Sequence, residues 1–151
     1  MKIGILGSGV VGQTIAAKSQ RLATNVSSAP ANPKKLKRGW ANLGTHRRSD
    51  VQRMIPWLAD LIDELRPDIL HCGPITQAAP LVFLARGRCR RPFPTWMVSN
   101  WGSDLHFTAR DPLVQPAVRH LLRSAEWYLA ECERDVDLAR RTGFAGRVAG
   151  V

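Results

Sequence analysis

The stretch MKIGILGSGVVG (Met1–Gly12) decides the fold. The apolar run Lys2–Leu6 predicts a short buried strand, and apolar residues return at helical spacing within Val10–Leu22. Between them, the six residues Gly7, Ser8, Gly9, Val10, Val11 and Gly12 fit the pattern G-x-G-x-x-G. In a strand–turn–helix context this pattern lets a pyrophosphate approach free backbone amides at the helix start. The opening therefore predicts a phosphate-binding βα unit. The alternative is a glycine turn that packs strand on helix and binds nothing.

The residues after this unit favour NADP over NAD as the dinucleotide. NAD-binding sites usually carry an acidic residue about 20 positions after the glycines, where it binds the ribose 2′-hydroxyl. Here Ser27 and Ser28 lie near that position, and Lys34 and Lys35 follow. Serine and lysine suit a 2′-phosphate, so Ser28, Lys34 and Lys35 join the six loop residues as candidate cofactor-binding residues.

Further along the chain, predicted strands and helices alternate. Because alternation implies a mostly parallel sheet, the predicted fold class is a doubly wound, Rossmann-like α/β sheet with helices on both faces. A division near residue 48 separates the glycine-loop segment 1–48 from the α/β segment 49–151, and together they predict one incomplete domain. The predicted strands are 68–72, 95–99, 127–130 and 147–151, and the predicted helices are 49–66, 75–86, 113–123 and 131–142, with a polar loop over 100–112.

The positive charge is concentrated at the start of the chain. The net charge is +10, and residues 1–49 contain nine Lys or Arg and no acidic residue. Such a segment suits a phosphate-bearing small molecule or an anionic membrane surface, or it is simply a solvated loop. Nucleic acid is not an expected partner, because no aromatic residues or recognition motif accompany the charge. Three cysteines without metal-ligand spacing indicate a reducing compartment, hence a cytoplasmic protein, peripheral to the inner face of the membrane if it binds lipid.

Two resemblances to known families follow these patterns. The segment MKIGILGSGVVGQTIAAK (Met1–Lys18), continued faintly by ANPKKLKRGW (Ala31–Trp40), resembles the opening of deazaflavin-dependent NADP oxidoreductases and of pyrroline-carboxylate reductases. This resemblance implies NADP binding at the glycine loop. It ends before any substrate-binding or catalytic part of such an enzyme.

The second resemblance covers about 100 residues. The blocks LRPDILHC (Leu65–Cys72), FPTWMVSNWGSDLHF (Phe93–Phe107) and LAECERDVDLARRTGFAGRV (Leu129–Val148) are similar to the N-terminal half of family 4 glycosyltransferases. Those enzymes pair two Rossmann-like domains in the GT-B fold, and the N-terminal domain usually holds the acceptor. The resemblance implies hexosyl transfer, with the nucleotide-sugar half supplied by a partner chain. The competing interpretations are an NADP-binding oxidoreductase fragment and a non-catalytic nucleotide-binding remnant.

The same resemblance assigns candidate site residues. His71 and Asp104 are the catalytic candidates, and Asn100, Trp101, Gly102 and Ser103 are the substrate-binding candidates, because this polar loop follows a strand whose carboxyl end faces the cleft. Gly73 and Trp101 replace residues that the family often has as histidine, which puts a catalytic base in doubt. The alternatives are a structural His71, a helix-capping Asp104 and a packed Trp101. No metal site is predicted, and the acidic residues Glu131, Glu133, Asp135 and Asp137 are expected on an exposed helix face without a catalytic role.

Overall fold

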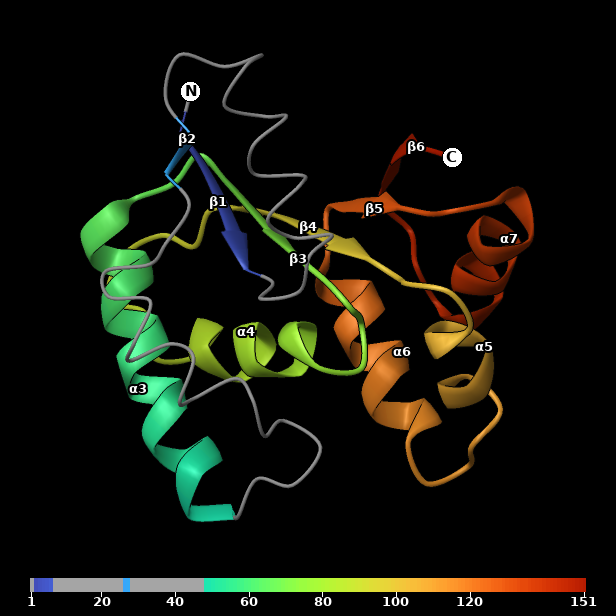
Figure 1. Ribbon diagram of the computed structural model, residues 1–151, viewed down its shortest axis with the longest axis horizontal. Helices are drawn as coiled ribbons and strands as arrows, with labels where there is room; N and C mark the ends of the chain where they lie inside the picture. Colours follow the sequence, from blue (N-terminus) through green and yellow to red (C-terminus); the bar gives the residue numbers. More distant parts are fainter. Residues whose placement is uncertain (1, 7–25, 28–47) are drawn as a thin grey trace.

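The computed structural model describes residues 2–6, 26–27 and 48–151, and within these ranges it has one six-stranded parallel sheet (Figure 1). The strand order is β2-β1-β3-β4-β5-β6, which confirms the predicted parallel α/β fold. β1, from the first segment of the chain, pairs directly with β3 from the second. The strands are β1 (Ile3–Leu6), β2 (Val26–Ser27), β3 (Ile69–Cys72), β4 (Thr95–Ser99), β5 (Trp127–Leu129) and β6 (Arg147–Gly150).

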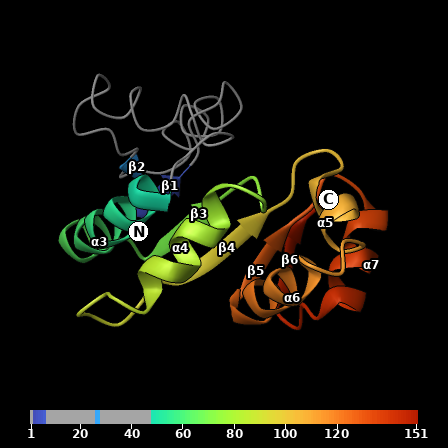
Figure 2. The same ribbon diagram turned by 90° about the horizontal axis from the view of Figure 1, so that it is seen from below.

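The described helices follow one another across the sheet, with α3 against α4, α4 against α6, and α6 against α7 (Figures 1 and 2). Every crossover from β2 to β6 moves in the same direction, so the right-handed rule places these connecting helices on one face. The β1–β2 crossover moves the opposite way, and the helix predicted there lies outside the described residues. The helices are α3 (Arg48–Leu65), α4 (Ala78–Arg86), α5 (Asp104–Thr108), α6 (Gln115–Ser124) and α7 (Glu133–Thr142).

The core forms where alternate strand residues meet the helices. The core residues of the three central strands are each at most 5% exposed: Leu70 and Cys72 of β3, Trp96 and Val98 of β4 and Tyr128 of β5. The residue between Trp96 and Val98, and the two neighbours of Tyr128 in β5, are half-buried. The Trp96 indole Nε1 donates a hydrogen bond to Cys72 Sγ at 3.0 Å. Burial raises the pKa of Cys72 to about 12, so this thiol is neutral and belongs to the core.

The predicted elements between residues 75 and 123 differ from the structure in three places. The polar loop 100–112 contains the short helix α5, which is held by the fully buried Leu105. α6 begins at Gln115, because the Asp111 carboxylate accepts a hydrogen bond from the Leu113 backbone and holds a turn there. α4 begins at Ala78, because the Pro74 carbonyl accepts bonds from the backbone amides at 77 and 78.

The sheet order reverses between β1 and β3. β2 lies on one side of β1, while the chain from β3 onward proceeds to the other side. Leu6 and Cys72, the last residues of β1 and β3, are register partners. Ligands of open α/β sheets bind beyond the carboxyl ends of the strands near such a reversal. The fold therefore directs attention to this edge, which we call the carboxyl edge.

Candidate functional site

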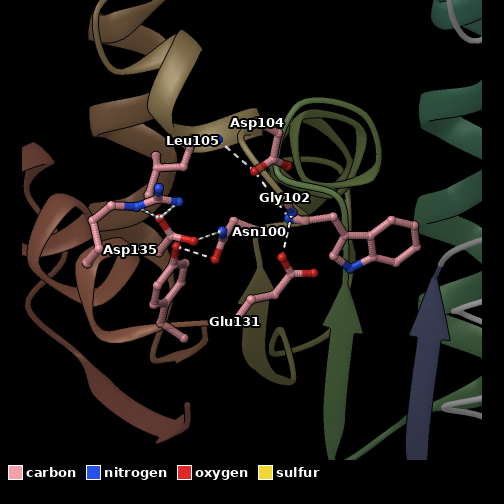
Figure 3. Close-up of polar contacts among 9 residues, drawn as sticks. Asn100, Gly102, Asp104, Leu105, Glu131 and Asp135 are labelled. Carbon is pink, nitrogen blue, oxygen red and sulfur yellow. Dashed lines mark hydrogen bonds and ion pairs between the residues drawn. The ribbon is translucent and has the colours of Figure 1, made fainter.

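Three loops meet at the carboxyl edge. They follow β3 at Cys72, β4 at Ser99 and β5 at Leu129, and these strands are parallel neighbours. The second loop, Asn100–Ser103, carries the four residues predicted to bind substrate, and we call it the β4–α5 loop. Side chains of neighbouring elements hold it through the hydrogen bonds drawn in Figure 3.

Asp104 ties the β4–α5 loop to the loop after β3. Its Oδ1 accepts hydrogen bonds from the backbone amides of Trp101 at 3.2 Å and Leu105 at 2.6 Å, and its Oδ2 accepts one from Ile75 at 2.9 Å. Burial raises the pKa of Asp104, and the charge of Glu131 adds to the rise, against the lowering effect of the three amides. Three of roughly four carboxylate acceptor positions are thus used inside the protein.

Asn100 fixes the start of the same loop inside the protein. Its Oδ1 accepts a hydrogen bond from the Tyr128 hydroxyl at 2.7 Å, and its Nδ2 donates one to Asp135 Oδ2 at 2.8 Å. The other Asp135 oxygen accepts from Arg134 Nε and Nη2 at 3.0 and 2.9 Å. Asn100, Tyr128 and Asp135 are each at most 1% exposed. These three buried groups therefore form a satisfied chain from β5 through the loop to α7.

The charge of Asp135 is stabilised by this chain. Burial alone would raise its pKa, but hydrogen bonds from Asn100 and Arg134 outweigh burial and hold the pKa below its ordinary value. Burial also raises the pKa of Tyr128, and the nearby Asp135 charge adds to that rise. Tyr128 therefore stays protonated and donates, while Asp135 stays ionised and accepts. The predicted acidic helix face is wrong at this position, because Asp135 faces Asn100 rather than water.

Trp101 packs over the loop that follows β3. A Cβ added to Gly73 would come within 2.9 Å of the Trp101 indole Nε1 and within 2.3 Å of Ser99 Oγ. No side chain fits at position 73 unless one of these groups moves. Trp101 is half-buried, whereas Gly102 and Ser103 are exposed, and Gly102 takes the left-handed φ of 57° that favours glycine. The loop thus presents an aromatic side chain next to open backbone.

His71 lies below this loop, at the end of β3. It is 7% exposed, and its Nε2 is 3.1 Å from Ser99 Oγ. Burial lowers the pKa of His71 to about 4. The imidazole is therefore neutral at physiological pH and shares a hydrogen bond with the serine.

Residues 34–130 match the family described as glycosyl transferase 4-like, which is well over half of the chain. The chain belongs to this family. No curated protein matched the chain.

This glycosyl transferase 4-like match includes the β4–α5 loop, His71 and Asp104, so the second sequence resemblance is confirmed at the level of the family. The NADP resemblance is not supported by it. The residues predicted to bind a dinucleotide, Gly7 to Gly12 with Ser28, Lys34 and Lys35, lie outside the described residues. Their role, and NADP as a cofactor, stay predictions.

In this glycosyl transferase 4-like chain, the six candidates lie at the carboxyl edge, in β3, the β4–α5 loop and the first residue of α5. Their roles stay predictions. Among residues 2–6, 26–27 and 48–151, no group of three or more metal-ligating side chains is placed to hold an ion. No described helix has the length and apolar character required to cross a membrane.

Sequence reasoning missed Glu131 as a member of this edge. It was assigned to α7, but Cys132 is extended, with a φ of −159°, and α7 begins at Glu133. Glu131 therefore lies in the loop after β5, where its Oε2 accepts a hydrogen bond from the Gly102 amide at 2.8 Å. No sequence pattern points to this bond, because the two residues are 29 positions apart.

Proposed function

We propose that this chain is the acceptor-side domain of a glycosyl transferase, and that the β4–α5 loop binds the acceptor. The observation that supports this most is the way Asn100 and Asp104 fix both ends of the loop around an accessible Trp101. A loop held in one conformation loses little entropy on binding a ligand. The family match over the same residues favours a glycosyl transfer partner over any other ligand.

The chemistry of the loop suits a saccharide. A sugar ring presents an apolar face of C–H groups and a rim of hydroxyls, and ligand sites usually combine an aromatic surface with a few fixed polar groups. Trp101 provides the aromatic surface, and the backbone of Gly102 and Ser103 is exposed beside it. The nucleotide-sugar-binding half needed for hexosyl transfer would come from outside the described residues.

His71 suits the role of a neutral hydrogen-bonding group rather than that of a general base. General bases act best when their pKa lies near the working pH, and a pKa of about 4 is well below that range. Its Nε2 is also engaged with Ser99 Oγ. We therefore propose that binding of the acceptor, rather than proton abstraction by His71, is the contribution of these residues.

Saccharide binding tests this function directly. We expect methyl α-D-mannopyranoside or methyl α-D-glucopyranoside to give saturation-transfer NMR signals with the folded protein. Trp101→Ala should raise the dissociation constant about tenfold, which corresponds to about 1.4 kcal/mol. Trp57→Ala is the matched control, because Trp57 is 44% exposed on α3 and lies in a different element. Equal weakening by both variants, or no signal with any glycoside, would contradict the proposed function.

A further inference from the structure

We propose that Glu131 binds hydroxyl groups of the acceptor, and that the acceptor group at the carboxyl edge is an uncharged saccharide. This inference rests on the proposed function and names the substrate class of the same loop. Glu131 lies just beyond the residues 34–130 that match the family, so the family match does not assign it a role.

The position of Glu131 is set by the β4–α5 loop. Its Oε2 accepts a hydrogen bond from the Gly102 amide, and Figure 3 shows its side chain reaching from the loop after β5 to Gly102. Gly102 directly follows Trp101 in the chain. A carboxylate oxygen is thus held on the backbone of the residue that follows Trp101, whose side chain is proposed to contact the sugar. Because the side chain is already anchored, ligand binding costs it little conformational entropy.

The hydrogen-bond capacity of the three carboxylates at this edge separates their roles. Asp104 accepts from three backbone amides and is part-buried. Asp135 uses both oxygens on Asn100 and Arg134 and is 1% exposed. Glu131 is exposed and, within the described part of the chain, accepts a single hydrogen bond. An ionised carboxylate has about four acceptor positions, so Glu131 is the one of the three with free positions facing water.

Among the described residues, the charge at the loops after β4 and β5 argues for a neutral ligand there. Asp104 and Glu131 accept hydrogen bonds from the consecutive backbone amides of Trp101 and Gly102, at 3.2 and 2.8 Å, so both carboxylates lie against the same short stretch of loop. The positive charge of Arg134 is used by Asp135. A phosphate placed here would meet two like charges, which is unfavourable. Hydroxyl groups instead donate charge-assisted hydrogen bonds to a carboxylate, and such bonds are about twice as strong as bonds between neutral groups.

Two substitutions of Glu131 test the inference. Glu131→Gln keeps an oxygen that can accept from the Gly102 amide but removes the charge, and Glu131→Ala removes both. We expect the dissociation constant of the best methyl glycoside to rise about fivefold in Glu131→Gln and about twentyfold in Glu131→Ala. These values lie on either side of the roughly tenfold change that corresponds to the loss of one strong hydrogen bond. Glu133→Gln is the matched control, because it makes the same charge change two residues away, at the exposed first position of α7, and leaves the bond between Glu131 and the Gly102 amide intact.

The outcomes separate this inference from the proposed function. Unchanged glycoside affinity in both Glu131 variants would overturn the role of Glu131 and leave the acceptor domain standing. Tighter binding of glucose 1-phosphate than of methyl α-D-glucopyranoside would overturn the neutral substrate class. No binding of any glycoside by the wild-type protein would overturn the proposed function, and this inference with it. Thermal unfolding of each variant confirms that the fold is retained.

Discussion

Asn100→Asp is expected to destabilise the protein by about 3 kcal/mol at about pH 7, and by much less in acid. Asn100 offers Asp135 a donor, the Nδ2 group, at 2.8 Å. An aspartate would place a second carboxylate against Asp135 in a site where both residues are almost fully buried. Like charges that close cannot both ionise, so the pKa of the new carboxyl is raised in the folded state. A rise of about two units corresponds to the stated loss.

The sign of the pH dependence follows from that raised pKa. The pKa of such a carboxyl is higher in the folded protein than its unfolded value of about 3.9. Its contribution to the free energy of unfolding is fully present below about pH 3.9, and it is lost as the pH rises through the folded pKa. Denaturant unfolding at several pH values measures the difference between variant and wild type. Asn100→Leu is the control, because it leaves the Tyr128 hydroxyl and Asp135 without their partner but adds no charge. An Asn100→Asp penalty that does not grow from acid to neutral pH would contradict the buried chain described here.

Titration of His71 is expected to remove about 3 kcal/mol of stability as the pH falls from about 6.5 to about 4. In the unfolded chain the imidazole takes up a proton near pH 6.5, whereas burial in the folded protein delays this until about pH 4. The unfolded state therefore binds more protons throughout this window, so the free energy of unfolding rises with pH across it. The contribution is complete above the window and is lost below it.

Comparison of the wild type with His71→Gln isolates this group. All other ionisable groups are the same in both proteins, so the difference between their pH profiles belongs to position 71. We expect the slope of unfolding free energy against pH to be flatter in the variant by up to about 1.4 kcal/mol per pH unit. Parallel profiles would show that His71 is not buried as a neutral group. Ser99→Ala should leave most of the slope in place, because burial rather than the serine lowers the pKa.

The sequence was sufficient to predict the sheet and most of the helices. Strands such as Ile69–Cys72 are short apolar runs, and α3 has a regular apolar face of Ile55, Leu58 and Ile62. Gly143 ends α7 with a φ of 122°, a left-handed conformation that favours glycine. These features depend on neighbours within a few positions, where periodicity and backbone preference act.

The polar arrangement at the carboxyl edge depends on distant partners, so the sequence did not reveal it. Asp135 lies among acidic residues that suggest a solvated helix face, yet its partner Asn100 comes from the β4–α5 loop, 35 positions earlier. Glu131 similarly leaves the helix predicted for it and bonds to Gly102. Asp104 was identified as a candidate, but its three bonds to backbone amides could not be predicted from a local pattern.

Chemical-shift mapping of a bound glycoside tests the central claim most directly. Backbone amide spectra of the isotopically labelled protein would be recorded during titration with the best methyl glycoside. We expect the largest shifts at the Trp101 and Gly102 amides and at Glu131, with the turn at Arg88–Arg91 at the opposite edge unchanged. Shifts centred on that opposite turn, with Asn100–Asp104 unaffected, would contradict an acceptor site at the carboxyl edge.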